Sequence, residues 1–555
     1  MLSGGSSRFR GKTFSRWASV LISPFRRPVT AVSPLSRRSG ANSIPQGAHS
    51  LFAPPSAARR ITTAWNRSRC DEFVTFHAYA EDQTPVSDPA RASHPMYVSS
   101  NRLRLLRSGV PALLLLAVLA QPVAGWPASN AAPAAIPDAF LALLTGDGNE
   151  ITDAFTTLDH HWDETCIPMA LETLYLSRNL HVTGRLVELL QQKSGQTFGF
   201  DIGKWQEWLW SRPGKQHPRY ADFKSRLYRT IDPRFAHYFA TERPREIRLD
   251  EIVWGGVRQD GIPPLRQPRM IGAAAADYLK DDNVIFGVEI NGDVRAYPKR
   301  IMAWHEMFVD EVGGIPVTGA YCTLCGAMIL YRSGGHQLGT SGFLYRSNKL
   351  MYDQATQSLW NTLWGTPVVG PLVGKGIALE RLSIVTTTWG EWRRRHPDTQ
   401  VLSLDTGYAR DYREGVAYFE YFLTDELMFA VPGRDSRLPN KDEILGLVLA
   451  QAPDQPLAIS ARYLHRHPVY HDALGPVRFV VLTDRSGANR VFDSADVRFV
   501  SWDRGRVALD DQGKRWTLTE AALFGPDGRT LHRLPAHRAF WFGWFSAYAH
   551  TRLVK

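Results

Sequence analysis

The segment that most constrains the fold of this chain is 322–326, with the sequence Cys-Thr-Leu-Cys-Gly, between two short runs of strand-forming residues. The runs span 317–321 and 327–332. In thioredoxin-type redox sites a Cys-x-x-Cys pair opens a helix, whereas in metal knuckles it occupies a turn between two strands. The flanking runs therefore favour a knuckle or a plain disulfide. Gly326 stands where c-type haem attachment requires a His, which excludes that site.

Two cysteines supply only half of the ligands that a tetrahedral zinc or copper site usually has. His305, which lies shortly upstream and is followed by Glu306, is the best candidate for a further ligand. His336 and the soft donor Met351 are additional candidates. The expected cofactor is therefore Zn or Cu, held by Cys322, Cys325 and His305. The same two cysteines support the alternative of a disulfide or dithiol without metal.

Polar residues are densely interspersed among apolar ones between 341 and 360, as expected for the wall of a pocket. Glu306 and Asp353 are the candidates for a catalytic carboxylate or for a group that orients a ligating His. For Asp353 the local sequence favours the alternative of an Asp that caps a turn. Arg410 with Asp411 forms either a structural ion pair or a contact with a carboxylate substrate. The predicted pocket residues are Tyr321, Ser347, Asn348, Lys349, Tyr352, Trp360, Arg410 and Asp411.

The sequence pattern changes from helical to strand-like near residue 246. Helical periodicity dominates at first, with Trp205, Trp208 and Leu209 on one helix face, and we expect these side chains in a core. Strand patterns and hairpin turns follow, including an Asn-Gly turn within 284–297. We therefore predict an α+β protein, with a small helical N-terminal domain before a larger strand-rich domain with hairpins and short helices. The predicted parts are a leader (1–95), a signal peptide (96–125), a linker (126–136), a helical domain (137–245) and a strand-rich domain (246–555).

Other local patterns predict individual elements. The range 388–396 predicts a short helix ended by Pro397, and 339–353 predicts a Gly-rich turn together with a further strand. The aromatic segment 539–544 is expected to pack into the core. Cys166 is alone in a helical stretch and is expected to be a small buried hydrophobe.

The segment 96–125 has the pattern of a secretory signal: three arginines, an apolar stretch at 110–120, and small residues after it. The apolar stretch is shorter than the ~20 residues that a transmembrane helix needs. We expect export to the periplasm or the extracellular space, with a retained membrane anchor as the alternative. Membrane contact is expected only through this segment. Because 95 residues precede the pattern, we hypothesise that the true start is Met96 and that the leader comes from a misassigned start codon.

The formal net charge of +11 does not extend to the body of the protein. Residues 1–95 hold 13 Lys and Arg against 5 Asp and Glu, and 96–125 add three arginines. Residues 126–555 hold 49 basic and 49 acidic residues. A neutral body has no bulk attraction for phosphates, so no nucleic-acid partner is expected. A small-molecule or protein partner is left open.

Several short motifs occur in a specific order between about 250 and 550. They are Asp260–Pro264, Arg295–Pro298, His305-Glu306, Tyr321–Gly326, Ser341-Gly342, Ser347–Asp353, Ser358–Trp360, Thr388-Trp389, His396-Pro397, Thr406-Gly407, Arg410–Tyr412 and Ala539–Phe542. In this set the chain resembles the bacterial and archaeal family known as domain of unknown function 3179. The resemblance implies the boundary of the strand-rich domain and an exported location, and it implies no activity, substrate or cofactor. Lys349 departs from the apolar residue common in that family, which implies a more acidic ligand if this position lines the pocket.

Three functional hypotheses follow from these residues. The first is an exported metal-binding protein that uses the two cysteines and His305. The second is a thiol–disulfide redox protein that uses the same cysteines. The third is a ligand- or partner-binding module in which the cysteines form a structural disulfide. Whether the protein is an enzyme is left open.

Overall fold

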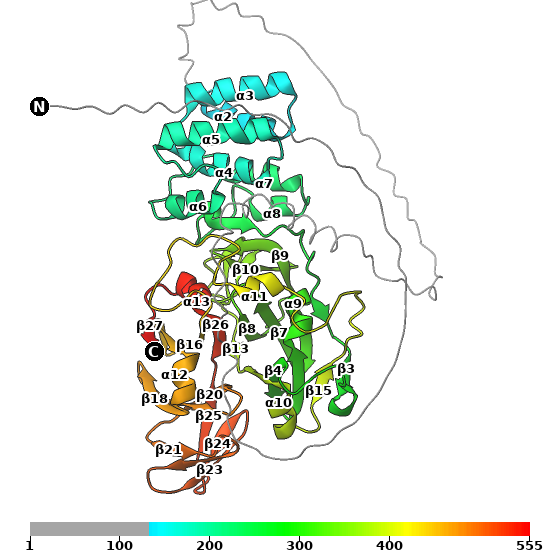
Figure 1. Cartoon of the computed structure of the whole chain (residues 1–555), viewed down its shortest axis with the longest axis vertical. Helices are drawn as coiled ribbons and strands as arrows, with labels where there is room; N and C mark the ends of the chain where they lie inside the picture. The colour runs from blue at the N-terminus through cyan, green and yellow to red at the C-terminus, as the bar shows by residue number, and fades with distance from the viewer. Residues whose placement is uncertain (1–131) are drawn as a thin grey trace, which may run out of the picture. The chain divides into compact units, whose positions relative to one another are not determined.

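The computed structural model describes residues 132–555, so the predicted leader and signal peptide lie outside the described residues. Helices occupy the N-terminal part of the described residues and strands dominate the remainder, which confirms the predicted α+β class (Figure 1). The first described helix begins at Ala132, inside the range predicted as a linker. In the part of the chain that the structure describes, no helix is long and apolar enough to cross a membrane.

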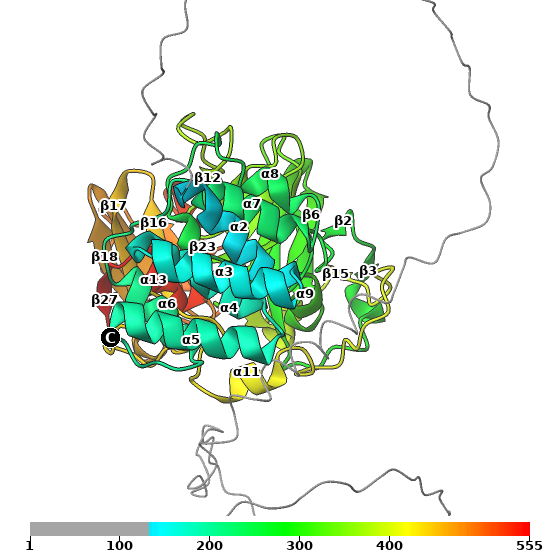
Figure 2. The same cartoon turned by 90° about the horizontal axis from the view of Figure 1, so that it is seen from above.

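The helical part is a group of packed short helices (Figure 2). They are α2 (Ala132–Thr145), α3 (Gly148–His161), α4 (Ile167–Leu176), α5 (Leu180–Ser194), α6 (Ile202–Trp210), α7 (Tyr220–Arg229) and α8 (Phe235–Tyr238). Helix α4 contacts α2, α5, α6 and α7 and is therefore the centre of the group. Local signals fix two of the helix ends in this group: Asp147 and Glu150 form a capping box at the start of α3, and Gly195 ends α5 in the left-handed conformation.

The core of the helical part is aromatic and continues into the first strand of the strand-rich part. Trp205 and Leu209 are buried in it, as predicted, and Trp208 packs against it; Trp210 is buried there as well. Cys166 is a free, buried side chain in the same core. The indole of Trp210 donates to the carbonyl oxygen of Asp250 at 3.1 Å, which ties α6 to the segment before the first strand.

Five sheets make up the strand-rich part. The first has the order β1 (Ile252–Trp254), β9 (Leu338–Tyr345), β10 (Asn348–Asp353), β11 (Leu359–Asn361) and β12 (Thr366–Val369). The second has the order β13 (Arg381–Leu382), β8 (Ala327–Arg332), β7 (Ile315–Cys322), β6 (Met307–Val312) and β2 (Leu265–Arg266). The third has the order β14 (Val385–Thr388), β4 (Val284–Ile290), β5 (Asp293–Pro298), β15 (Gln400–Leu402) and β3 (Met270–Gly272).

The last two sheets come from the C-terminal third of the chain. One has the order β26 (His537–Phe540), β16 (Glu443–Leu449), β17 (Ala452–Ser460) and β27 (Arg552–Val554). The other has the order β18 (Val469–Leu474), β19 (Val477–Thr483), β20 (Asn489–Asp493), β25 (Thr530–Leu534), β24 (Ala522–Phe524), β23 (Arg515–Leu518), β22 (Val507–Asp510) and β21 (Phe499–Trp502). Short helices between the strands are α9 (Lys299–His305), α10 (Trp389–Arg395), α11 (Phe419–Leu423), α12 (Ala461–Arg466) and α13 (Trp541–Ala547).

Local turn chemistry explains the elements that the sequence predicts best. Strands β4 and β5 form the expected hairpin, and its turn residues Asn291 and Gly292 both have positive φ, as a type I′ turn requires. Helix α10 lies within the predicted range 388–396 and begins with a cap in which the Thr388 hydroxyl accepts from the N–H of Glu391.

The predicted Gly-rich turn within 339–353 is wrong. Gly339 and Gly342 both lie inside strand β9, and the turn between β9 and β10 falls at Arg346 and Ser347. The reason for glycine at 339 is packing, because a Cβ there would stand 2.4 Å from the ring of Tyr352. A glycine can therefore mark a close contact within a strand as well as a turn.

The C-terminal aromatic segment packs into the core, as predicted. Trp541 and Trp544 of α13 are fully buried. Figure 1 shows strand β26 and helix α13, in red, at the end of the chain beside β16. Strand β26 also contacts β8, which follows the cysteine turn. The end of the chain therefore lies against the Cys-x-x-Cys segment.

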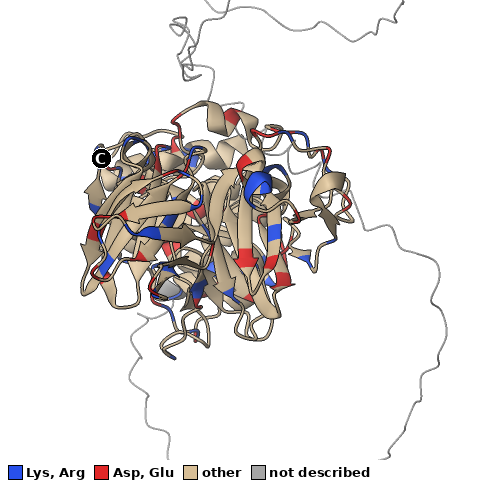
Figure 3. Cartoon of the chain, turned by 90° about the horizontal axis from the view of Figure 1, so that it is seen from below, with Lys and Arg blue, Asp and Glu red and all other residues tan. Residues whose placement is uncertain are grey.

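Charged residues of both signs are distributed over the strand-rich part. Figure 3 shows Lys and Arg interspersed with Asp and Glu. This distribution agrees with the equal numbers of basic and acidic residues in 126–555.

Candidate functional site

The cysteine turn is a strand–turn–strand element. Strand β7 ends at Cys322 and β8 begins at Ala327, with Cys322 and Ala327 paired in the ladder. The N–H of Cys325 donates to the carbonyl oxygen of Cys322 at 3.1 Å, which closes the turn. Gly326 has φ of 58° and lies against the ring of Phe540. This is the knuckle-like geometry expected from the sequence, and it differs from a cysteine pair at a helix N-terminus.

The two sulfur atoms face each other inside the protein. The Sγ atoms of Cys322 and Cys325 lie 2.9 Å apart, and both cysteines are free and buried. The thiol of Cys325 also faces Oδ1 of Asn348 at 2.9 Å and the carbonyl oxygen of Ser347 at 3.4 Å. The amide of Asn348 donates in turn to the carbonyl oxygen of Gly543 at 3.3 Å. Asn348 therefore links the second thiol to the C-terminal helix α13.

The turn that carries Ser347 is strained. Arg346 and Ser347 have φ of 50° and 65°, the left-handed region that favours glycine. Non-glycine residues in this conformation cost of order 1–3 kcal/mol each and cluster at functional sites. The guanidinium of Arg346 donates to the buried carboxylate of Glu251 at 2.5 Å, which helps to hold the turn. The turn presents Ser347 and Asn348 to the sulfur of Cys325.

Glu306 reaches the site from the end of helix α9. Its φ of 53° ends the helix in the left-handed conformation. Its carbonyl oxygen accepts from the N–H of Tyr321 at 2.8 Å and from Nζ of Lys349 at 2.5 Å. Its carboxylate accepts from the hydroxyl of Tyr418 at 3.3 Å and lies 3.8 Å from Nζ of Lys349. Burial raises the pKa of Glu306, and Lys349 opposes that effect.

Lys349 is a buried lysine whose ammonium group interacts with both Glu306 and Cys322. Its side chain is 5% exposed and extends from β10 toward Glu306. Burial lowers the pKa of Lys349, while the charges of Glu306 and Cys322 raise it. The acidic group that lies beside the ammonium group of Lys349 in the structure is the carboxylate of Glu306, a residue of the protein itself.

The surroundings of the two thiols shift their pKa values in opposite directions. Burial alone would raise the pKa of Cys322, but the hydrogen bond between the two thiols and the backbone N–H groups of Lys349 and Cys325 outweigh burial and lower that pKa. Burial and the neighbouring Cys322 raise the pKa of Cys325 well above its usual value. Cys322 is therefore the thiol that ionises first, and Cys325 holds its proton.

His305 points away from Glu306, because the left-handed turn at Glu306 separates the directions of the two side chains. Its Nδ1 lies 2.9 Å from the carbonyl oxygen of Pro263, and its Nε2 lies 2.6 Å from the hydroxyl of Tyr412. Burial lowers the pKa of His305 to about 4, so the ring is neutral near pH 7. Within residues 132–555 no group of three or more His, Cys, Asp and Glu side chains is arranged to hold a metal ion.

Asp353 has a full set of local hydrogen bonds. Its carboxylate accepts from the N–H and the hydroxyl of Thr356, from the N–H of Ser358 and from the indole of Trp360. These bonds close the turn between β10 and β11, as in the turn-capping alternative. Tyr352 donates to the carboxylate of Asp260 at 2.5 Å.

The other predicted site residues fall into three groups. Met351 and Trp360 belong to the same buried core as the two cysteines, and the ring of His336 packs on Trp360 with centroids 5.0 Å apart. Tyr321 is buried in a different core, where its ring packs against Phe286. Asp411 pairs with Arg413, while the guanidinium of Arg410 donates to the carbonyl oxygen of Ala409.

Four residues of the site were missed in the sequence. Tyr418 donates to Glu306, and Tyr421 donates to the carbonyl oxygen of Leu324 at 2.8 Å. The N–H of Phe540 donates to the carbonyl oxygen of Cys325 at 2.7 Å, and Gly543 lies against Cys325. All four come from segments distant in sequence. The only local signal was the aromatic density of 539–544, which indicated a core without saying what it would contact.

Replacing Gly543 with alanine is expected to disturb the site directly. The new Cβ would stand 2.8 Å from Cβ and 3.1 Å from Sγ of Cys325. We expect a loss of about 1–3 kcal/mol of unfolding free energy from overpacking, measured by urea denaturation. Gly184 in α5 has open space around it, so Gly184→Ala is the matched control and should stabilise the protein by about 0.5–1 kcal/mol. Equal effects of the two substitutions would contradict the close contact at Cys325.

Comparison with known proteins gives a family and no assigned activity. The family described as "Protein of unknown function (DUF3179)" matches residues 259–551, which include the cysteine turn, the hairpin with Asn348 and the C-terminal aromatic segment. Neither a curated protein nor a solved structure matches the chain. The matched range covers more than half of the 555 residues. The chain therefore belongs to the DUF3179 family.

Proposed function

We propose that this protein is an exported thiol–disulfide redox protein in which Cys322 and Cys325 form a reversible disulfide. The observation that carries the proposal is the distance of 2.9 Å between the two Sγ atoms on one closed turn. A disulfide has an S–S bond of about 2.05 Å, so small side-chain rotations would join the sulfurs. In an exported protein the compartment permits disulfides to persist.

The unequal thiols give each cysteine a role. The thiolate of Cys322 attacks one sulfur of a partner disulfide R–S–S–R′, which forms a Cys322–S–R bond and releases R′–S⁻. Cys325 then loses its proton, and its sulfur attacks Sγ of Cys322, which forms the intramolecular disulfide and releases R–S⁻. The partner is reduced to two thiols, which take up the two protons that the cysteine pair has lost. The protein dithiol is oxidised by two electrons.

The residues around the sulfurs support this assignment. A metal cation at the sulfurs would be repelled by a protonated Lys349, whereas a single thiolate at Cys322 is stabilised by it. Asn348 faces Sγ of Cys325 and Gly543 leaves it room, so these two residues position the thiol that closes the disulfide. Lys349 and Asn348 are neighbours on β10, and one strand therefore supplies both the charge and the positioning contact.

The segment that contains α11 packs against the cysteine turn and is our candidate for the part that moves to give access to the buried pair. The hydroxyl of Tyr421 in this helix donates to the carbonyl oxygen of Leu324, between the two cysteines, and the ring of Phe422 packs on that of Phe540. The outer side of the same helix exposes Phe419 and Leu423 at 57% and 66%. We include in the proposal that a protein partner displaces this short helix when its disulfide approaches Cys322.

Metal binding is the second candidate function. The observation that favours it is the knuckle geometry, with backbone N–H groups directed at Sγ of Cys322. Zinc or copper bound by Cys322, Cys325 and His305 would require His305 to leave its contacts with Pro263 and Tyr412. Because both candidates use the same cysteines, one experiment separates them.

The test is a combined thiol and metal count on the full chain. We expect Cys322 and Cys325 to resist alkylation after exposure to a small-molecule disulfide and to regain two reactive thiols after reduction and unfolding, as mapped by mass spectrometry. The matched control is Cys166→Ser, which removes another buried free cysteine and should leave this cycle unchanged. One equivalent of zinc or copper that disappears in Cys322→Ser would replace the redox proposal by metal binding.

A further inference from the structure

An open groove lies on the C-terminal sheet and shares no residue with the cysteine site. It has a volume of about 500 Å³ and is lined by α12, β18 and β21. This volume falls within the range of about 300–1,000 Å³ that is typical of small-molecule sites. The nitrogen Nε2 of His471 contacts the backbone of Phe499 at 3.0–3.1 Å and thereby joins β18 to β21 across the floor of the groove.

Aromatic rings form most of the lining. Tyr463 stacks on His467, with centroids 4.1 Å apart and 23° between the planes. Tyr463 also meets Tyr470 edge to face at 90°, with centroids 5.6 Å apart. The rings of His471 and Phe499 lie nearly parallel at 10°. These orientations offer both faces and edges of rings, which is the geometry that a further aromatic ring prefers.

The charge available in the groove is positive. The exposed guanidinium of Arg498 has no hydrogen bond or ion pair with another residue of the described range 132–555. Burial lowers the pKa of His471, and the charge of Arg498 adds to this effect. The acidic group on β18, Asp472, already pairs with Arg552 at 2.8 Å and accepts a hydrogen bond from the hydroxyl of Tyr470. A carboxylate that enters the groove would therefore meet the unpaired guanidinium of Arg498 and no unpaired negative charge on β18.

We infer that this groove binds a small aromatic carboxylate, with its ring against Tyr463 and Tyr470 and its carboxylate on Arg498. A bidentate arginine–carboxylate contact supplies direction and strength. The lining is mostly aromatic and offers few unpaired polar groups, so a flat apolar ring with one acidic group matches it better than a polyhydroxylated sugar does.

The experiment is isothermal titration calorimetry of the full chain with 4-hydroxybenzoate. Three further probes separate the contributions: benzyl alcohol has the ring without the charge, cyclohexanecarboxylate has the charge without the aromatic ring, and glucuronate carries the carboxylate on a sugar ring. The variant is Arg498→Gln. The matched control is Arg515→Gln, which removes another exposed arginine from the same sheet, on β23.

Saturable binding of 4-hydroxybenzoate that weakens about tenfold or more in Arg498→Gln and is unchanged in Arg515→Gln would support the inference. Arg498→Lys should retain part of the affinity, because it keeps the charge and loses the fork. Absence of binding, equal affinity of the wild type and Arg498→Gln, or tighter binding of glucuronate than of the aromatic acid would each overturn it. These outcomes do not depend on the cysteines, so the inference and the redox proposal can fail separately.

Discussion

Replacing Lys349 with methionine is expected to suppress the reactivity of Cys322, and replacing Glu306 with glutamine is expected to increase it. Lys349 favours the thiolate of Cys322 by charge attraction, whereas the carboxylate of Glu306 opposes it. Loss of the cation therefore raises the pKa of Cys322, and loss of the carboxylate lowers it. Because one pKa unit corresponds to tenfold in the thiolate fraction, we expect changes of about tenfold in rate, in opposite directions.

The measurement is the rate of reaction with a small-molecule disulfide as a function of pH, together with the ultraviolet absorbance of the thiolate. At pH values below the pKa of Cys322 the thiol is protonated, so the reaction rate decreases as the pH is lowered. The midpoint of this profile should move to higher pH in Lys349→Met and to lower pH in Glu306→Gln. The exposed Lys375 provides the control, since Lys375→Met should leave the midpoint in place. Movement of both midpoints in one direction would show a structural disturbance in place of charge coupling and would contradict the assigned roles.

The sequence predicted the parts of the site that depend on neighbouring residues. The strand runs on each side of Cys322 and Cys325 were sufficient to place the pair in a turn, because strand propensity and glycine conformation act within a few residues. The same holds for the Asn291-Gly292 hairpin, whose backbone conformation favours those two residue types.

The sequence could not predict contacts between distant segments. Asn348 was recognised only as a polar residue of a pocket wall, and its position beside Cys325 depends on the turn at Arg346 and Ser347. That turn uses two non-glycine residues in a conformation that usually signals itself by Asn-Gly. The contact of Gly543 with Cys325 depends on the packing of β26 against β8, which no local pattern encodes.

His305 and Glu306 show why adjacency in sequence did not give adjacency in space. Both were expected at the cysteines because they are neighbours and lie shortly upstream. The left-handed φ of Glu306 ends α9 there and sends the carboxylate toward Lys349, while His305 contacts Pro263 and Tyr412. A non-glycine residue with positive φ carries a weak sequence signal, so the separation of the two side chains became visible only in the structure.

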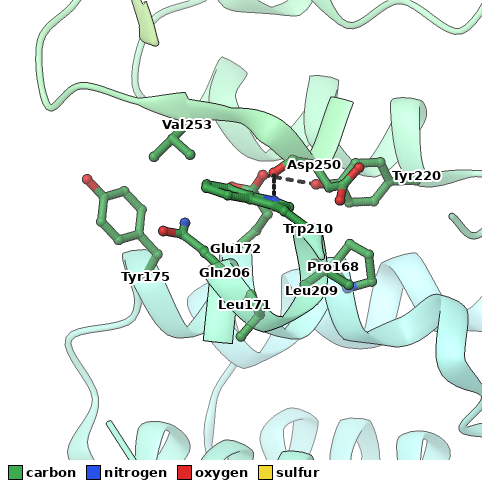
Figure 4. Close-up of a pocket in the computed structure, with 10 residues that line it drawn as sticks. All are labelled: Pro168, Leu171, Glu172, Tyr175, Gln206, Leu209, Trp210, Tyr220, Asp250 and Val253. Atoms are coloured by element: carbon green, nitrogen blue, oxygen red, sulfur yellow. Dashed lines mark hydrogen bonds between the residues drawn. The ribbon is translucent and has the colours of Figure 1, made fainter. Parts of the chain in front are cut away.

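The largest expected loss of stability comes from Lys224, which is buried at the contact between the helical part and strand β1. Its ammonium group donates to Glu172 and, at 2.7 Å, to the carbonyl oxygen of Ile252. Tyr220 and Tyr228 donate to the same carboxylate. A neighbouring cavity of about 20 Å³ lies between α4, α6, α7 and the segment before β1 (Figure 4), with room for about one water molecule. The site therefore leaves little space for solvent to replace a lost charge.

Lys224→Met is expected to reduce the free energy of unfolding by about 3–5 kcal/mol, because it leaves the carboxylate of Glu172 buried without its cation. The double variant Lys224→Met, Glu172→Gln should recover much of this loss, since the neutral amide can still accept from the two tyrosines. The matched control is Lys204→Met on α6, where the lysine side chain is 64% exposed and pairs with Asp201 at 3.6 Å; an exposed pair of this kind contributes at most about 1 kcal/mol. Urea denaturation followed by tryptophan fluorescence measures all three. If Lys224→Met unfolds at the same urea concentration as Lys204→Met, the buried pair does not hold the helices to β1, and the apolar core that the two parts share must do so alone.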